Sequence, residues 1–434
     1  MKKGFVISWF YPPGNSSEGL VTYKLLSNSK LHYDVWTRND QHQNMWDRKS
    51  DEKELVSKNV NIVLGPGDIK EWVEAGVKYF IEHKDEYSFI MSRSMPPESH
   101  EIGLKIKEKV PEIKWIASFG DPLVDTPYVN EITMEGLDNP FSIKECFTRE
   151  KFSIPGAMKL AISPLRLANK TLWKKEAKKA GVIGKYYNYI NDSVLKLADR
   201  IIYNNDYQLE HAFKQDEYKE FRRKACVIEH SFDESLYPLK KETTKKLSFV
   251  YVGHLDDNRN AMPLFKAIRV LKDNDPKLGE KVSFDFYGHL CADDKLYILE
   301  KNIYDIVKIH GDVSYIESLR LIKNADWAIL IDANFTAMMD ECIFLPAKTM
   351  DYLGARTKIF LISHIKGADS DILRKTGGGI IVTHVPDEIC MYLSKIIYQG
   401  YKPEEFNKKE VDKYSSINVA KRMDGEIERV IKLK

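Results

Sequence analysis

The chain has 434 residues, of which 43% are hydrophobic and 30% charged, and this composition excludes an intrinsically disordered protein. Its length makes two domains the starting expectation. Lysine and arginine number 66 against 64 aspartate and glutamate residues, a formal charge of +2, so we expect no nucleic acid as a partner.

The opening residues, MKKGFVISWFYPPG, contain two lysines and a short apolar run. The run breaks at Tyr11-Pro12-Pro13, which indicates a first β-strand rather than a signal peptide. No stretch approaches the roughly 18 apolar residues of a membrane-spanning helix. The five cysteines are scattered and lack metal-ligand spacing. We therefore expect a cytoplasmic protein, either soluble or peripheral on the inner face of the cell membrane.

Apolar runs alternate with amphipathic segments through the first half of the chain. This alternation predicts an α/β domain, residues 1–238, with a parallel sheet and helices on both faces. Its predicted strands are 5–10, 33–37, 60–63, 87–91, 115–119, 199–203 and 225–229. Because parallel sheets bind ligands at the carboxyl ends of their strands, residues that follow these strands are candidates for a site.

Two such positions carry polar residues. The loop after the first predicted strand holds Ser17, Glu18 and Gly19 ahead of a helical pattern, a geometry that presents backbone N–H groups to an anion or substrate. It lacks the glycine spacing of the GxGxxG dinucleotide fingerprint, and a plain strand-to-helix connection is the alternative. Asp121 follows the strand at 115–119, although aspartate before proline also forms ordinary turns.

Residues 151–190 combine lysines with aromatic and aliphatic residues, a composition typical of a helix that lies on an anionic membrane surface. The alternatives are a solvated helix face and, with no recognisable module in support, a site for single-stranded nucleic acid. The candidate membrane patch consists of Lys174, Lys175, Lys178 and Lys179.

A polar stretch, residues 239–246, is predicted to link the first domain to a second one, residues 247–409. The second domain repeats the alternation, with predicted strands at 247–252, 283–287, 307–309, 327–331, 360–362 and 380–382. An amphipathic helix, residues 410–434, follows and is a candidate to pack back on the first domain. The predicted fold class is α/β, with two Rossmann-like domains facing each other across a cleft.

Three predicted strands of the second domain end where glycine and histidine are neighbours, at positions 253–254, 288–289 and 310–311. Glycine there indicates that the backbone approaches another group closely or turns sharply. Arg259 follows the first of these strands and is placed to bind phosphate oxygens, which arginine matches with two parallel hydrogen bonds.

The stretch DECIFLPAKTMDYLGA, residues 340–355, is predicted to form a helix that begins at Pro346. Such a helix has a buried side formed by Ala347, Met350 and Gly354. Its opposite side then carries Lys348, Asp351 and Tyr352. The helix N-terminus and the Lys348 charge together suit a phosphate, with a carboxylate one turn away for hydroxyl groups. An ordinary capped surface helix is the alternative.

Several stretches, taken in their order, resemble the GT-B glycosyltransferases, and more narrowly the family-4, retaining type of bacterial polysaccharide biosynthesis. From the first half these are WFYPPGNSSEGLVTYKLL, ADRIIYNN and CVIEHSFDESLY. From the second half they are FVYVGHLDDNRNAMPLFKAI, IVKIHGDVSYIESLRLIKNADWAILID and FLPAKTMDYLGARTKIFLIS. The resemblance covers most of the second half and parts of the first.

The resemblance implies that Arg259 and Lys348 bind the diphosphate, that Asp351 holds the ribose and that the loop 310–313 lies against the base. The donor-binding set it implies is Gly253, His254, His310, Gly311, Val313, Leu345, Pro346, Ala347, Asp351 and Tyr352. The family has two glutamates separated by seven residues. Here Asp351 matches the second, but Ile343 stands at the first, and Glu341 lies two residues early.

The implied activity is transfer of a hexosyl group from a nucleoside diphosphate sugar, with a UDP-sugar favoured, to a hydroxyl of a glycan or lipid-linked acceptor. Arg259 and Lys348 would stabilise the charge that develops on the diphosphate, so neither a metal nor another cofactor is expected. Asp121 is the candidate to orient the acceptor hydroxyl. Two DxD triplets, at 273–275 and 369–371, are interpreted as turns in surface loops.

Two other functions remain open. One is a catalytically silent, glycosyltransferase-like partner that binds glycan or recruits an active subunit, which the isoleucine at position 343 motivates. The other is a sugar-nucleotide epimerase or a glycosyl phosphorylase on the same fold.

Overall fold

The computed structural model describes residues 3–12, 16–39, 55–133, 164–238, 246–256 and 258–432, without the side chains of 164–174, 176 and 177. The chain divides into two compact units, one formed by Met1–Asp121 with Leu197–Lys434 and the other by Pro122–Lys196. The first unit contains two parallel sheets. The predicted linker falls almost entirely on residues outside the described ranges.

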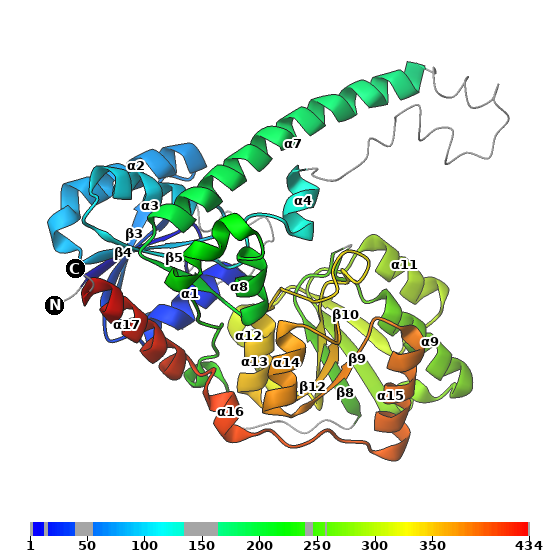
Figure 1. Cartoon of the computed structure of the whole chain (residues 1–434). Helices are drawn as coiled ribbons and strands as arrows, with labels where there is room; N and C mark the ends of the chain where they lie inside the picture. Colours follow the sequence, from blue (N-terminus) through cyan, green and yellow to red (C-terminus); the bar gives the residue numbers. More distant parts are fainter. Residues whose placement is uncertain are drawn as a thin grey trace. The chain divides into compact units, whose positions relative to one another are not determined.

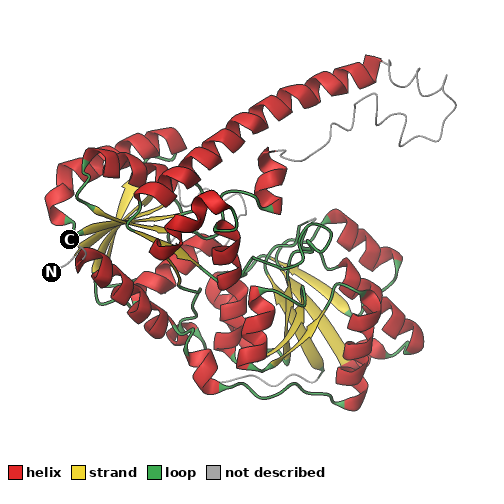
Figure 2. Ribbon diagram, viewed as in Figure 1, coloured by secondary structure: helices red, strands yellow, loops and turns green. Residues whose placement is uncertain are grey.

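The first sheet has seven parallel strands in the order β3-β2-β1-β4-β5-β6-β7. The strands are β1 (Lys3–Ser8), β2 (His32–Arg38), β3 (Val60–Gly65), β4 (Phe89–Arg93), β5 (Lys114–Ser118), β6 (Arg200–Tyr203) and β7 (Ala225–Val227). Helices cover both of its faces (Figures 1 and 2). They are α1 (Ser17–Ser27), α2 (Ile69–His83), α3 (Glu98–Lys109), α8 (Asp206–Ala212) and α17 (Ser416–Lys432). Short 3-10 turns lie at Lys84–Glu86, Asp216–Lys224 and Glu234–Leu236.

The second sheet has six parallel strands in the order β10-β9-β8-β11-β12-β13. They are β8 (Leu247–Val252), β9 (Val282–Tyr287), β10 (Val307–Gly311), β11 (Trp327–Ile331), β12 (Lys358–Ile362) and β13 (Gly379–Val382). The helices of this half are α9 (Met262–Asn274), α10 (Leu278–Lys281), α11 (Ala292–Glu300), α12 (Tyr315–Asn324), α13 (Ala347–Ala355), α14 (Ala368–Thr376), α15 (Pro386–Gln399) and α16 (Lys408–Asp412).

Each face of the second sheet has its own apolar core. One core joins the sheet to α9, α11 and α15, and the other joins it to α12, α13 and α14 (Figure 1). Every strand in both sheets was predicted, and the α/β fold class is confirmed. Strands such as β11 and β12 are largely apolar runs, the pattern by which a sequence identifies buried parallel strands.

The last helix of the chain packs on the first sheet. Val419, Met423, Ile427 and Val430 of α17 share one core with Val6 of β1. The Asp424 carboxylate accepts hydrogen bonds from the Ser29 hydroxyl at 2.5 Å and from the Lys30 backbone N–H at 3.0 Å. The continuous helix predicted for 410–434 is wrong, however. The chain leaves helix between α16 and α17, where Ser415 pairs with Phe232 as an isolated bridge.

The second unit contains α4 (Pro127–Thr133) and the long α7 (Pro164–Leu197). At about 1.5 Å per residue, the 34 residues of α7 span roughly 50 Å. Of the candidate membrane patch, Lys175, Lys178 and Lys179 are exposed, whereas the side chain of Lys174 lies outside the described residues. Within the described ranges, no helix is long and apolar enough to cross a membrane.

Candidate functional site

Three strands of the second sheet end at, or directly before, glycines whose backbone conformation other residues rarely adopt. Gly253, Gly288 and Gly311 have φ values of +117°, +118° and +79°. A Cβ on Gly288 would lie 2.2 Å from the carbonyl oxygen of Gly253, and one on Gly253 would lie 2.4 Å from Nζ of Lys348. At the carboxyl edge of this sheet, neighbouring backbone segments and the Lys348 side chain therefore approach more closely than a side chain on these glycines would allow.

Lys348 lies against that backbone, in the first turn of α13. Its Nζ donates a hydrogen bond to the Tyr251 hydroxyl at 3.0 Å and lies 4.8 Å from the centroid of the same ring. The Tyr251 hydroxyl in turn donates to the backbone carbonyl of His254 at 3.2 Å. The ammonium charge is thereby held beside Gly253, at the end of β8.

Arg259 lies in the same neighbourhood. Burial raises the pKa of the Tyr251 hydroxyl, and the Arg259 charge opposes that rise, so both cations act on Tyr251. Nη2 of Arg259 is 3.8 Å from Oδ1 of Asp332, a fully buried carboxylate at the end of β11. Two cations separated by 89 positions in the sequence thus share one tyrosine neighbour.

The helix that presents Lys348 begins at Ala347, and Pro346 is its N-cap residue rather than its first helical residue. The predicted faces are also partly wrong. Asp351 and Tyr352 are buried, at 7% and 0% exposure, whereas Ala347 and Gly354 are only half-buried. The α13 helix is covered on more sides than the sequence pattern suggested, because Tyr352 belongs to the core beneath the sheet.

Asp351 makes contacts that the sequence did not reveal. Its Oδ1 accepts hydrogen bonds from Nζ of Lys24 and from the Tyr315 hydroxyl, both at 2.8 Å. Its backbone carbonyl accepts one from the Tyr237 hydroxyl at 2.8 Å. Lys24 is fully buried in α1. The residue predicted to hold the ribose is therefore also half of a buried ion pair.

The segment that precedes α13 is apolar. Ile343, Phe344 and Leu345 are all buried, and the carbonyl oxygen of Ile343 accepts a hydrogen bond from Nδ2 of Asn205 at 2.9 Å. Glu341, the nearest carboxylate in the sequence, is exposed. Position 343 therefore offers a buried aliphatic side chain where the family motif has a carboxylate.

The two histidines of the predicted donor loops each have a carboxylate partner. Nε2 of His254 lies 2.9 Å from Oδ1 of Asp312, and Nε2 of His310 lies 2.7 Å from Oδ1 of Asp285. The His310 ring stacks on Tyr287, with 4.4 Å between ring centroids. Val313 is half-buried just beyond this stack. A flat, partly exposed aromatic pair at the end of β9 and β10 suits stacking of a planar base.

On the first sheet, Ser17, Glu18 and Gly19 lie in the first turn of α1, so the prediction that they form a loop is wrong. Gly19 is buried, and a Cβ there would lie 3.2 Å from the Tyr11 backbone. This close packing brings the helix start directly against the segment that follows β1.

Glu18 points inward from that helix turn. Its Oε2 lies 3.6 Å from Nη2 of Arg93, a buried residue at the end of β4. Burial raises the pKa of Glu18 to about 7, with Arg93 opposing the rise and Asp121 adding to it. Burial likewise raises the pKa of Asp121 to about 6, with Arg259 opposing and Asp332 adding. Nε2 of Gln208 donates to Oδ1 of Asp121 at 3.2 Å.

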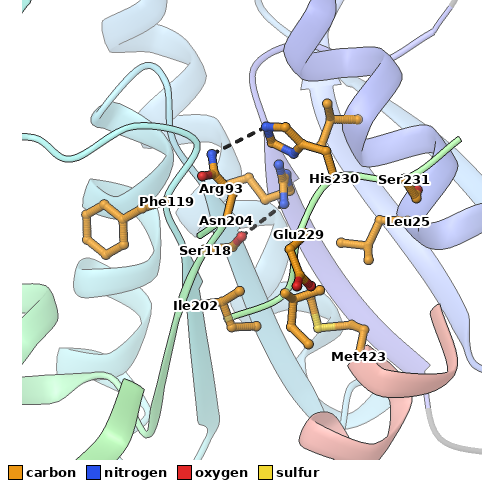
Figure 3. Close-up of a pocket in the computed structure, with 12 residues that line it drawn as sticks. Leu25, Arg93, Ser118, Phe119, Ile202, Asn204, Glu229, His230, Ser231 and Met423 are labelled. Carbon is orange, nitrogen blue, oxygen red and sulfur yellow. Dashed lines mark hydrogen bonds between the residues drawn. The ribbon is translucent and has the colours of Figure 1, made fainter. Parts of the chain in front are cut away.

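A small cavity lies behind this group, on the α1 side of the first sheet (Figure 3). Its polar lining includes Arg93, whose Nη1 donates to the Ser118 hydroxyl at 2.9 Å, and an Asn204–His230 hydrogen bond of 3.3 Å. Its volume of about 10 Å³ is room for roughly one water molecule. The cavity is therefore too small for a sugar.

The two DxD triplets differ in the structure. Asp273 is exposed but lies in the last turn of α9, and Asp275 is the half-buried C-cap residue of that helix, so only the surface position of this triplet agrees with the predicted loop. Asp369 is fully buried in the first turn of α14, so its placement in a surface loop is wrong. Among the described residues, no group of three histidine, cysteine, aspartate or glutamate side chains is arranged to hold a metal ion.

No protein-family model matches the chain, and no curated protein matches it. Solved structures do. A sucrose-phosphate synthase from Thermosynechococcus elongatus is 12% identical, with a TM-score of 0.57 and coverage of 99% of this chain and 98% of that one. The lipopolysaccharide outer core galactosyltransferase WaaB is 12% identical, with a TM-score of 0.55 and coverage of 99% of each chain.

The chain has the GT-B fold. This fold also occurs in a UDP-N-acetylglucosamine 2-epimerase that is 9% identical, with a TM-score of 0.53 and coverage of 98% of this chain and 95% of that one. Identities this low show the fold alone. The solved structures of similar fold thus include both glycosyltransferases and epimerases.

The sequence-based set omitted several residues of this site. Arg93 was missed because the predicted strand ended two residues early, at 91, whereas β4 continues through polar Ser92 to Arg93. Lys24 had a usable signal, since it is a single charge within the apolar run LVTYKLL. Asp332 had only its place after a predicted strand, a position that many surface aspartates share.

Proposed function

We propose that this protein is a glycosyltransferase that moves a sugar from a nucleoside diphosphate sugar to a hydroxyl of a glycan or lipid-linked acceptor. One observation carries the proposal: Arg259 and Lys348, from different elements, both act on Tyr251 at the carboxyl edge of the second sheet. Ligands of open parallel sheets bind at such an edge. A UDP-sugar is the proposed donor, on the resemblance and on the UDP-sugar in the name of the similar epimerase.

Cleavage of the bond between the anomeric carbon and the diphosphate leaves negative charge on the leaving group. The Arg259 guanidinium, the Lys348 ammonium and the N-terminus of α13 supply positive charge where that leaving group would lie. This charge supports a metal-independent transfer. Retention of the anomeric configuration is proposed on the resemblance to the family-4 enzymes.

Asp121 is the proposed contact for the acceptor hydroxyl. It follows β5, and the Arg259 charge acts on its carboxyl group. This influence of charge supports grouping the acceptor candidate with the diphosphate candidate. Burial raises the pKa of Glu18 to about 7, and this half-buried residue adds a second acid to the acceptor side.

Turnover of nucleotide sugars with and without an acceptor hydroxyl compound tests the function. We expect release of a nucleoside diphosphate from at least one of the UDP-, GDP- and ADP-sugars, with the rate increased by acceptor. Formation of an epimeric nucleotide sugar without acceptor would instead establish an epimerase. If the protein shows no turnover and binds no nucleotide, the silent partner is favoured. The structural reason for that alternative is the buried Ile343.

The exposed lysines of α7 support a second partner, an anionic membrane surface. Lys175, Lys178 and Lys179 are exposed; Glu176 lies between the first two, and residues 177–191 contain no acidic residue. Exposed Val182 and Tyr189 lie at helical spacing from them and would enter the lipid headgroup layer. Each lysine near such a surface contributes about 1 kcal/mol, so three act together appreciably.

Reversing all three lysines to glutamate is expected to weaken binding to phosphatidylglycerol-containing vesicles by at least about 100-fold in a sedimentation assay. The matched control reverses Lys402, Lys408 and Lys409, which are also exposed, and should retain binding. Equal loss in both variants, or undiminished binding after reversal in α7, would remove the membrane from the proposal.

A further inference from the structure

Two fully buried carboxyl groups lie around one serine at the carboxyl edge of the second sheet. The Ser363 hydroxyl is 3.3 Å from Oδ2 of Asp332 and 3.2 Å from Oδ1 of Asp369. Both aspartates have 0% exposure. Neither belongs to the donor-binding set that the sequence predicted.

The hydrogen bonds around this pair require an additional proton. A serine hydroxyl has one proton and donates to only one of two carboxylates, so two ionised groups would leave one oxygen–oxygen contact repulsive. A buried anionic oxygen without a hydrogen-bond partner is costly. One of the two aspartates is therefore neutral.

The neutral group is Asp369. Asp332 accepts from the Ala333 backbone N–H and from Sγ of Cys342, each at 2.8 Å. Asp369 accepts from the Ser370 N–H at 2.7 Å on Oδ1, but its Oδ2 is buried with no hydrogen-bond partner among the described residues. Burial and the Asp332 charge raise the pKa of Asp369 well above its usual range.

The other titratable groups around the pair add no negative charge near neutral pH. The Phe335 N–H donates to Nε2 of His364 at 3.2 Å, and burial lowers the pKa of His364. Burial lowers the pKa of His384 to about 4. Burial and the neighbouring carboxylates raise the pKa of the Cys342 thiol well above its usual range. The net result is one negative charge, on Asp332, facing Arg259 and Asp121.

We propose that Asp332 is the positioning residue for Arg259 and that Asp369 is held protonated behind it, so that this pair opposes the guanidinium with one carboxylate rather than two. The inference rests on the proposed function and names the group that orients its diphosphate ligand. Two ionised carboxylates behind a single guanidinium would cancel its charge and repel a diphosphate. One carboxylate fixes the direction of the guanidinium, and a neutral Asp369 adds no further negative charge to those of Asp332 and Asp121.

Three variants and three readouts (kcat, the nucleotide Kd and an infrared band) test this. Asp369→Asn keeps the shape of a neutral group, so we expect the Kd for the nucleoside diphosphate to stay within about threefold of wild type. Asp332→Asn releases Arg259, so kcat should fall by about 10- to 100-fold while the same Kd changes by less than about threefold. A matched control, Asp326→Asn, removes a carboxylate that bonds Ser248 at the opposite end of β8 and should leave kcat and Kd unchanged.

An infrared spectrum shows whether Asp369 is protonated, independently of any enzyme activity. At about pH 8, Glu18 and Asp121 are ionised, since their pKa values are about 7 and 6. Wild type should then show a protonated-carboxyl stretching band that Asp369→Asn lacks.

Absence of that difference, or a nucleotide affinity that Asp369→Asn tightens by about tenfold or more, would overturn the protonation of Asp369. An unchanged kcat in Asp332→Asn would overturn the positioning role. If wild type binds no nucleotide, the proposed function and the positioning role fail together. The infrared band still shows whether Asp369 is protonated. If Asp332→Asn does not fold, Asp369→Asn and the spectrum carry the test.

Discussion

Replacing Lys24 by methionine is expected to lower the free energy of unfolding by about 3–5 kcal/mol, the usual cost of removing one partner from a buried ion pair. Lys24 is fully buried, and its Nζ lies 2.8 Å from Oδ1 of Asp351, which is itself almost buried. Methionine fills a similar volume, so the loss of stability comes from the Asp351 carboxylate. That carboxylate loses its cationic partner and keeps only the hydrogen bond from the Tyr315 hydroxyl.

Urea unfolding followed by tryptophan fluorescence measures this loss, with Lys281→Met as the matched control. Lys281 pairs with Asp275 at 2.7 Å but is about half exposed, so its removal should cost less than about 1 kcal/mol. A Lys24 variant no less stable than the Lys281 variant would show that the pair does not stabilise the fold. The double variant Lys24→Met with Asp351→Asn should recover part of the loss, because no unpaired charge remains.

Replacing Lys348 by methionine is expected to lower turnover of the nucleotide sugar by about 100- to 1,000-fold, the range seen when one group that stabilises developing charge is removed. The methionine keeps the contact with the Tyr251 ring but carries no charge for the diphosphate. Stability should change by only about 1 kcal/mol, since one hydrogen bond to the Tyr251 hydroxyl is lost.

The matched control for this variant is Lys402→Met, which removes the same charge from an exposed position outside the site. It should retain wild-type turnover. Equal activity of the Lys348 variant and wild type, with the fold intact by circular dichroism, would remove Lys348 from the catalytic account.

The two sheets were predictable because central strands such as β11 are apolar runs followed by a polar or glycine residue, while strands such as β9 alternate apolar and polar residues. Errors occurred where the polarity of a residue does not match its burial, or where an element starts before its apolar pattern. The predicted strand at 87–91 stopped before Ser92 and Arg93, which are buried although polar. The helix of Glu18 starts three residues earlier than the apolar pattern that begins at Leu20, since its first turn packs on the end of β1 by way of Gly19.

The candidate site was predictable to the extent that its residues follow strands. Arg259 and Lys348 were found from their places after β8 and at the start of a helix. The partners of Asp351 were not, because Lys24 is 327 positions away and no local pattern links the two. The buried pair of Asp332 and Asp369 was missed for the same reason: an aspartate near a strand end or helix start is ordinarily a turn or cap residue, and only its burial reveals another role.

The central claim, that positive charge at the carboxyl edge of the second sheet receives a nucleoside diphosphate, is tested most directly by titration calorimetry of wild type and of Lys348→Met with UDP, GDP and ADP. The account predicts that wild type binds at least one of the three and that the variant binds it at least about tenfold more weakly, a difference of about 1.4 kcal/mol. Binding of none of the three by wild type, or equal affinity in both proteins, would contradict it.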